Sequence, residues 1–220
     1  MQTVRKMLVS AVVKIREEQV LSLVRHCLYK GIDPYILLED IRTGVDMVAE
    51  MYGQGKYFLA DLVMAAEIYK EAQEIILGSS EDQQAENPQV IFGTVEKDIH
   101  DIGKNIAITT LRQYRMSVLD LGVDVSAQVF VKKQQETGAP ILCMSGLISD
   151  AYDSMKKTVD LLKEKAESQP VVIIGGLVND AVCSYTGADY WVNSCIDGAN
   201  LCMKILKERK KIPVLDRSSK

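Results

Sequence analysis

One histidine with a carboxylate on each side lies in the segment D-I-H-D-I-G, residues 98–103. It is His100, one of two histidines in the chain, and Asp98 and Asp101 flank it. Neutral imidazole is a common ligand for transition metals, and a metal-bound imidazole usually donates its second N–H to a carboxylate. His100 is therefore a candidate metal ligand and catalytic residue, with Asp98 as its hydrogen-bond partner. Asp101 has two open roles, a carboxylate near a helix N-terminus and a cofactor contact.

The elements that must position this loop follow two patterns, of which the first is helical. In residues 1–80, apolar residues recur at a helical spacing without the alternation typical of strands. This pattern predicts helices over 4–30, 35–52 (one helix or a split one) and 57–77. Gly31, Asp33 and Pro34 mark the first boundary as a C-terminal cap, an N-cap and a first helical position. We therefore expect a helical bundle.

After residue 88 the pattern changes to short apolar runs that alternate with helical stretches. Strands are predicted at 89–95, 115–122, 140–146, 170–176 and 188–192. Helices are predicted at 103–114, 126–138, 150–167, around Val182 and at 197–211. This alternation predicts an α/β fold with a five-stranded parallel sheet covered on both faces. Ligands bind beyond the carboxyl ends of such strands, where we expect His100, Ser145 and the pair Gly175 and Gly176 to converge.

The two patterns divide the chain into a helical domain (1–80), a polar linker (81–88), an α/β domain (89–210) and a basic tail (211–220). The net charge of −4 argues against nucleic acid binding. No apolar run reaches about eighteen residues, so no membrane span is expected. The five cysteines are scattered without a C-x-x-C pair, which favours a reducing, cytoplasmic location.

Three short motifs follow one another at defined distances in the second half. D-x-H-x-x-G ends at Gly103, S-x-L begins at Ser145 after 41 residues, and G-G begins at Gly175, 27 residues after Leu147. All three at these distances would arise by chance in roughly one chain in a million. The pattern resembles the cobalamin-binding signature of corrinoid proteins and of cobalamin-dependent methionine synthase. The helical half is similar to the cap module of the methyltransferase branch, so the resemblance covers about residues 1–208.

This resemblance implies a helical cap followed by a flavodoxin-like or Rossmann-like sheet domain that binds cobalamin. Cobalamin would lose its own dimethylbenzimidazole ligand, bind His100 through cobalt and insert its nucleotide tail into the sheet domain. Ser145 would bind the buried base, Leu147 would shape the slot and Gly103 would allow a tight turn into the next helix. The implied cofactor-binding residues of this domain are Asp98, His100, Asp101, Ile102, Gly103, Ser145, Leu147, Ser149, Gly175 and Gly176.

In the helical half, the resemblance implies that Tyr52, Leu59 and Leu62 cover the upper face of the corrin, where the methyl group is carried. An apolar stripe at helical spacing is more usually bundle core, and this alternative stays open. Two positions depart from the family. Ala60 replaces a proline of the cap, and Ala151 replaces the serine of a histidine–aspartate–serine proton relay in methionine synthase.

The implied function is that of a corrinoid methyl carrier in anaerobic one-carbon metabolism. Cob(I)alamin would take a methyl group from a donor with the help of a substrate-specific methyltransferase. A second methyltransferase would move the group from methylcobalamin to tetrahydrofolate or a thiol cofactor, and a reductive activating protein would return oxidised cob(II)alamin to cob(I)alamin. The chain alone is not expected to be a complete enzyme. The methyl donor stays open among methylamines, methanol, betaines and aryl methyl ethers.

Other functions stay open from the sequence alone. A cobalamin-dependent sensor without catalysis could share both halves, and light-dependent or ligand-dependent oligomerisation would distinguish it from a carrier. The small subunit of an adenosylcobalamin mutase shares the D-x-H-x-x-G domain but lacks this cap. A flavodoxin-like FMN module would leave the distances between the motifs unexplained. In that case His100 would be a loop histidine paired with an aspartate, and Ser145 and the glycine pair would be plain strand-end turns.

Overall fold

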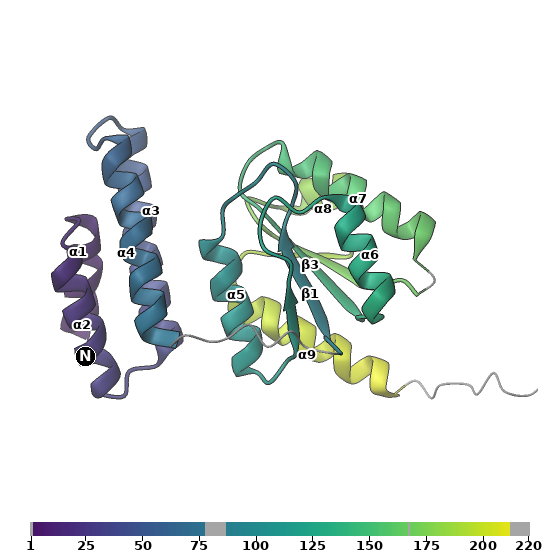
Figure 1. Cartoon of the computed structure of the whole chain (residues 1–220), viewed down its shortest axis with the longest axis horizontal. Coiled ribbons are helices and arrows are strands. Elements are labelled where there is room, and N and C mark those ends of the chain that lie inside the picture. Colours follow the sequence, from purple (N-terminus) through teal and green to yellow (C-terminus); the bar gives the residue numbers. More distant parts are fainter. Residues whose placement is uncertain (1, 78–86, 167, 212–220) are drawn as a thin grey trace, which may run out of the picture. The chain divides into compact units, whose positions relative to one another are not determined.

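The computed structural model describes residues 2–77, 87–166 and 168–211. The chain divides into two compact units, Met1–Gln83 and Gln84–Lys220 (Figure 1). The first unit is helical and the second contains both strands and helices. Most of the predicted linker and of the predicted tail lies outside the described residues, so these two boundaries stay predictions. None of the described helices is long and apolar enough to cross a membrane.

The first unit has four helices in its described part. They are α1 (Gln2–Val13), α2 (Glu17–Tyr29), α3 (Pro34–Gly53) and α4 (Leu59–Leu77). The prediction of one helix over 4–30 is wrong, because the chain turns at Ile15, whose φ is +53°. The turn allows Leu8 and Val12 of α1 and Val20 of α2 to be fully buried in one small bundle. Neither glycine nor proline marks this break, so local propensity does not reveal it.

The next helix boundary in this unit agrees with the sequence prediction. Gly31 has φ +73°, and the Asp33 carboxylate accepts a hydrogen bond from the Tyr35 N–H at 2.7 Å. Pro34 occupies the start of α3, where its missing N–H costs no helical hydrogen bond. α3 then runs unbroken to Gly53, so the helix predicted over 35–52 is single rather than split.

The second unit contains the predicted five-stranded parallel sheet. Its strands are β1 (Val90–Thr94), β2 (Val118–Asp120), β3 (Ile141–Gly146), β4 (Val171–Gly176) and β5 (Tyr190–Val192). Their order is β2-β1-β3-β4-β5, and each neighbouring pair is parallel. The direction of strand addition reverses between β1 and β3. In sheets of this order, ligands bind beyond the carboxyl ends of the strands at that point.

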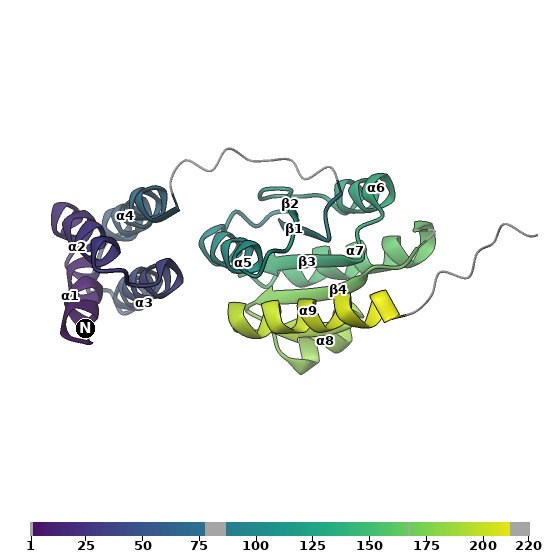
Figure 2. The same ribbon diagram turned by 90° about the horizontal axis from the view of Figure 1, so that it is seen from below.

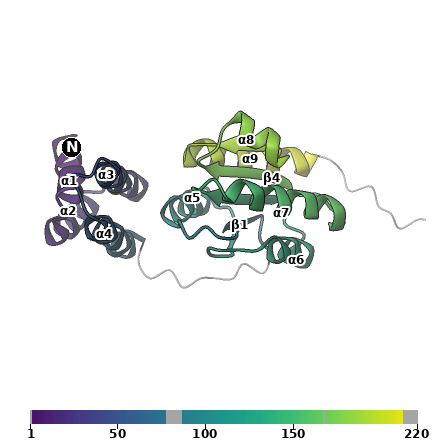
Figure 3. The same cartoon turned by 90° about the horizontal axis from the view of Figure 1, so that it is seen from above.

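Helices cover both faces of this sheet (Figure 2, and Figure 3 from the opposite side). They are α5 (Ile102–Gln113), α6 (Ala127–Thr137), α7 (Ala151–Lys165), α8 (Asp180–Thr186) and α9 (Cys195–Lys211). Phe130 of α6, Met155 of α7 and Val182 of α8 pack in the core on one face. Leu111 of α5 and Cys202 of α9 pack in the core on the other face. The central strands β1, β3 and β4 are therefore mostly buried on both sides, which accounts for their continuous apolar runs. The edge strands β2 and β5 are only partly buried.

Candidate functional site

His100 lies in the loop between β1 and α5, beyond the carboxyl end of β1. Its Nδ1 lies 2.6 Å from Asp98 Oδ1, and the same oxygen accepts the His100 backbone N–H at 3.0 Å. Thr94, the last residue of β1, donates its hydroxyl hydrogen to the His100 carbonyl at 3.1 Å. The histidine is thus held through its ring, its N–H and its carbonyl, while its side chain is 52% exposed.

Asp98 is the buried member of this pair. Its side chain is fully buried, and its second oxygen, Oδ2, accepts the Leu147 backbone N–H at 2.6 Å. Burial raises the pKa of the Asp98 carboxyl, but hydrogen bonds from Leu147 and His100 outweigh it and leave that pKa below its ordinary value. An ionised carboxylate only accepts hydrogen bonds, so Nδ1 of His100 carries the proton. The lone pair is then on Nε2, which is the nitrogen that can bind a metal.

The bond between Leu147 and Asp98 joins two motifs that are far apart in the sequence. Leu147 follows β3, and close by the Val95 N–H donates to the Ser145 carbonyl at 3.1 Å. The sequence predicts Leu147 only as a side chain that shapes a slot. Its backbone role is not visible in the sequence, because every residue except proline carries an N–H. The defined distance between the D-x-H and S-x-L motifs is the one signal that the two loops meet.

The glycine pair forms the end of β4, beside the end of β3. Ser145 pairs with Gly175 and Gly146 pairs with Gly176 in the parallel register. Gly176 has φ +105°, and a Cβ there would lie 2.2 Å from the Gly146 carbonyl oxygen, so the backbone itself requires this glycine. A Cβ on Gly175 would make an ordinary contact at 3.5 Å with the Val192 carbonyl oxygen. Packing within the protein therefore does not explain Gly175.

Gly103 differs from the prediction of a tight turn. It is the second residue of α5, and its φ is not positive. A Cβ at this position would meet no atom of the described residues within 4 Å, so these residues leave open space beside the backbone there. Asp101 and Ile102 are partly buried at the start of the same helix, and the Asp101 side chain makes no capping hydrogen bond. The prediction that Gly103 is needed for a tight turn into α5 is therefore wrong, and contacts among the described residues do not require a glycine at this position.

The loop after β3 carries the other predicted residues of the α/β unit. Ser145 is partly buried at the end of the strand, and Ser149 is exposed just before α7. Ala151 begins α7 and is fully buried, and a Cβ on Gly146 would lie 2.6 Å from its Cβ. The position that carries the relay serine in methionine synthase is therefore a core methyl group here.

The three predicted cap residues lie in the helical unit on either side of the G-Q-G break. Tyr52 is in the last turn of α3, and Leu59 and Leu62 are in the first turn of α4. Tyr52 is 42% exposed and Leu59 is 60% exposed, whereas Leu62 is partly buried. Tyr52 and Leu59 are therefore not ordinary bundle core. Other apolar side chains exposed nearby in the sequence are Phe58, Val63 and Met64.

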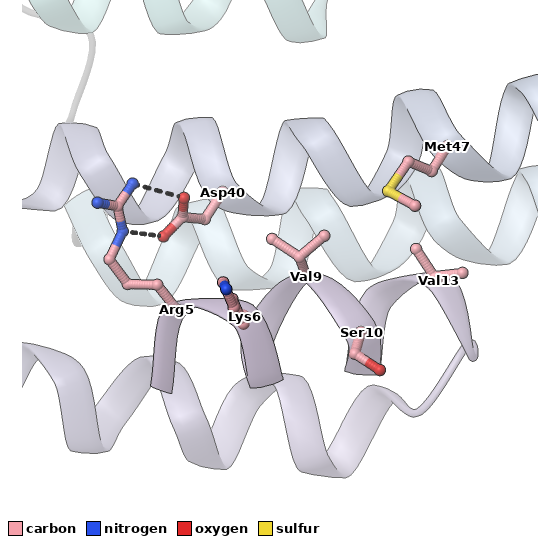
Figure 4. A pocket seen from close by; sticks show the side chains of 7 residues that line it. All are labelled: Arg5, Lys6, Val9, Ser10, Val13, Asp40 and Met47. Atoms are coloured by element: carbon pink, nitrogen blue, oxygen red, sulfur yellow. Dashed lines mark hydrogen bonds and ion pairs between the residues drawn. The ribbon is translucent and has the colours of Figure 1, made fainter. Parts of the chain in front are cut away.

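A separate pocket of about 500 Å³ lies between α1 and α3 of the helical unit (Figure 4). Arg5 of α1 donates two hydrogen bonds to the carboxylate of Asp40 in α3, at 2.7 and 2.8 Å. The other lining residues are Lys6, Val9, Ser10, Val13 and Met47. No predicted site residue lines this pocket, and the Arg5–Asp40 pair joins α1 to α3 at one end of it.

The described residues contain no cluster of side chains that could by itself hold a metal ion. No group of three His, Cys, Asp or Glu side chains in the described ranges could hold a metal ion. A metal bound at His100 would therefore take most of its ligands from another molecule, such as a macrocycle whose nitrogens surround it.

Comparison with known proteins shows which cofactor the chain binds. A family model for a B12 binding domain matches residues 88–192, and a second B12 binding domain model matches residues 4–77. Corrinoid protein DSY3155 of Desulfitobacterium hafniense is 36% identical over 171 residues, which cover 74% of this chain and 78% of the relative. Trimethylamine corrinoid protein 2 of Methanosarcina mazei is 30% identical over 204 residues, which cover 90% of this chain and 94% of the relative. The chain belongs to the corrinoid protein family.

Solved structures share the fold of this corrinoid protein. The monomethylamine corrinoid protein of Methanosarcina barkeri has a TM-score of 0.79 at 22% identity, with 93% of this chain and 99% of that chain covered. The methanol:cobalamin methyltransferase complex MtaBC of the same organism has a TM-score of 0.52 at 25% identity, with 93% and 80% covered. The predicted family and fold class are confirmed, and the cofactor is cobalamin.

The residues of the corrinoid protein fit this cofactor. A corrin surrounds cobalt with four nitrogens, so the protein needs to offer only an axial ligand. His100 offers one nitrogen of defined tautomer on an exposed side chain, and Gly103 leaves open space on the neighbouring helix. The role of each residue in cofactor binding remains a prediction.

Proposed function

We propose that this corrinoid protein carries a methyl group between two methyltransferases, with cobalamin bound base-off and His100 as the axial ligand. Bound cobalamin supplies a cobalt centre that accepts and releases the methyl group. The observation that carries the proposal is the 2.6 Å contact between His100 Nδ1 and the buried Asp98 carboxylate. This contact leaves Nε2 as the nitrogen that would bind cobalt, beyond the carboxyl end of β1, where the direction of strand addition reverses.

In this proposal Asp98 holds the proton on Nδ1 and increases the electron density that Nε2 donates. The Leu147 N–H occupies the other carboxylate oxygen, at 2.6 Å, and so prevents the carboxylate from turning away from the ring. Ala151 offers no hydroxyl. A proton relay through a serine at this position is therefore not available, and the proposed pair consists of His100 and Asp98.

The remaining residues bind and shield the cofactor. Ser145 and Ser149 would donate hydrogen bonds to its nucleotide tail, and Gly103 and Gly175 would let it approach the backbone. Tyr52, Leu59 and Leu62 would shield the reactive face from water, because an apolar cover limits side reactions. The exposure of Tyr52 and Leu59 in the helical unit supports this role.

The expected partners are inferred from the methyltransferase systems named for the relatives. One relative is a trimethylamine corrinoid protein, and one solved relative belongs to a methanol:cobalamin methyltransferase complex. We expect a substrate-specific methyltransferase as one partner and, as the other, an acceptor methyltransferase that uses tetrahydrofolate or a thiol cofactor. A reductive activating protein would complete the system. Methyl transfer from labelled methylamines or methanol to the loaded chain, with each candidate methyltransferase added in turn, would identify the donor.

Reconstitution with hydroxocobalamin tests the binding mode. The wild type should bind one cofactor per chain with a base-off visible spectrum, and its cobalt(II) form should show nitrogen splitting in electron paramagnetic resonance. His100→Ala should lose that splitting. His26→Ala is the matched control, since the second histidine is exposed on α2 in the helical unit. A wild type without bound corrinoid, or a His100→Ala protein that keeps the nitrogen signal, would refute the proposal.

A further inference from the structure

The loop that carries His100 is held by Asp124 from a second loop. Asp124 lies between β2 and α6, and β2 is next to β1 in the sheet. Its Oδ1 accepts the Lys97 backbone N–H at 2.7 Å, and its own N–H donates to the Asp98 carbonyl at 3.0 Å. Asp124 therefore bonds both to Asp98 and to the residue before it.

Lys97 needs such a partner because its backbone is strained. Its φ is +71° and that of Asp124 is +53°, both in the left-handed region. In this region the Cβ of a lysine crowds the backbone, whereas aspartate adopts it more readily. The Lys97 side chain is exposed, so core packing does not impose the conformation. The hydrogen bond from the Lys97 N–H to Asp124 stabilises it.

The conformation of Lys97 determines where Asp98 points. If Lys97 left the left-handed region, the chain after it would change direction and carry the Asp98 carboxylate with it. That carboxylate is held by two contacts of 2.6 Å, one to His100 Nδ1 and one to the Leu147 N–H. Both contacts are short, so a small displacement of Asp98 weakens them together.

We propose that Asp124 is a positioning residue for metal ligation: it holds Lys97 in the left-handed conformation and so keeps the Asp98 carboxylate aimed at His100. Asp124 acts through Lys97 and Asp98 rather than by contact with the metal. The inference rests on the proposed role of His100 as a ligand.

Two substitutions separate the hydrogen bond from the backbone requirement. Asp124→Gly permits the left-handed conformation but removes the acceptor for the Lys97 N–H. Asp124→Asn tolerates the same conformation and keeps an acceptor oxygen, so it should largely retain the hydrogen bond from the Lys97 N–H. Thermal unfolding of each apo-protein verifies that the fold is retained.

The first measurement uses the apo-protein and needs no cofactor. Amide hydrogen exchange by nuclear magnetic resonance reports the Lys97 and Leu147 N–H groups, which bond to Asp124 and Asp98 respectively. Asp124→Gly should speed exchange at both amides by about tenfold, the effect of losing one hydrogen bond to a charged acceptor. Asp124→Asn should speed exchange by less than about fivefold, because an acceptor oxygen remains although its charge is lost.

The second measurement uses the protein loaded with hydroxocobalamin and reduced to cobalt(II). Asp124→Gly should increase the fraction without nitrogen splitting by at least about fivefold, and Asp124→Asn should not. Faster exchange at Lys97 with unchanged exchange at Leu147 would overturn the proposal, because the effect would then stop short of Asp98. Equal losses in both variants would also overturn it. A wild type that lacks nitrogen splitting would instead refute the proposed ligand role of His100. Exchange at Leu147 would in that case still test whether Asp124 positions Asp98.

Discussion

Asp98→Asn changes one atom of the proposed site and forces a conflict between its hydrogen bonds. The wild-type carboxylate accepts two bonds at Oδ1 from His100 and one at Oδ2 from Leu147. Asparagine has one acceptor oxygen and one NH2 group. If its oxygen faces His100, the Leu147 N–H is left without an acceptor. If its oxygen faces Leu147, the NH2 group faces Nδ1, which must then accept, and the proton moves to Nε2.

The first arrangement destabilises the protein, and the second removes the ligand nitrogen. Loss of a hydrogen bond to a buried charged acceptor lowers the free energy of unfolding by about 2 kcal/mol. In a unit of this size, that lowers the melting temperature by about 5–10 °C. In the loaded protein, a weaker or absent imidazole ligand should change the cobalt(II)/cobalt(I) potential while the corrinoid stays bound.

The effect of Asp98→Asn on the free energy of unfolding should depend on pH. The folded protein lowers the pKa of Asp98 below its ordinary value of 3.8, so the ionised carboxylate stabilises the fold above that pH. This stabilisation is lost as the pH falls through the lower pKa of the folded state. The stability difference between the wild type and Asp98→Asn should therefore be constant between about pH 5 and 7 and shrink below about pH 4.

Urea unfolding of the apo-proteins at pH 7, 5 and 3.5 would measure this difference, and spectroelectrochemistry would measure the potential. Asp150→Asn is the matched control, because Asp150 precedes α7 without a capping hydrogen bond and is exposed. Its substitution should change the free energy of unfolding by less than about 0.5 kcal/mol. The reasoning is refuted if Asp98→Asn unfolds like the wild type at pH 7 and keeps its nitrogen signal and potential.

Three further substitutions test the glycines and the cap. Gly176→Ala should lower the free energy of unfolding by at least about 2 kcal/mol in urea, because its Cβ would meet the Gly146 carbonyl oxygen at 2.2 Å. Gly103→Ala should stabilise the apo-protein by about 0.5–1 kcal/mol and yet weaken cobalamin binding at least about fivefold. Gly53→Ala is the control, because Gly53 is also helical with open space beside it, and it should give the gain in stability alone. Undiminished affinity in Gly103→Ala would show that the cofactor lies elsewhere. Leu59→Ala should leave urea unfolding within about 0.5 kcal/mol of the wild type but speed photolysis of the methyl-loaded protein, and an unchanged photolysis rate would contradict the cap role.

Helices and strands were predictable from the sequence wherever the pattern of nearby residues determines them. Short apolar runs marked all five strands to within a few residues. The runs are continuous in β1, β3 and β4, because a parallel sheet buries both faces of its central strands. Gly31, Asp33 and Pro34 marked a helix boundary through their own backbone preferences. The turn at Ile15 was not predictable, because it results from the packing of α1 and α2 in the bundle and not from the residues at the turn.

For the site, the sequence by itself determined which chemistry is present. A histidine two residues from an aspartate, with S-x-L and G-G at defined distances, indicated the cobalamin family. The strand order then determined that the loops after β1, β3 and β4 meet at one edge.

Only the tertiary structure decided how His100 is held. The Leu147 N–H that binds the Asp98 carboxylate and the Asp124 carboxylate that binds the Lys97 N–H come from loops distant in the sequence. Backbone N–H groups are common to nearly all residues, so side-chain identity does not reveal which of them is used. The structure likewise decided that Gly103 is a helical residue with open space beside it rather than a turn residue. Both depend on which segments the folded chain brings side by side.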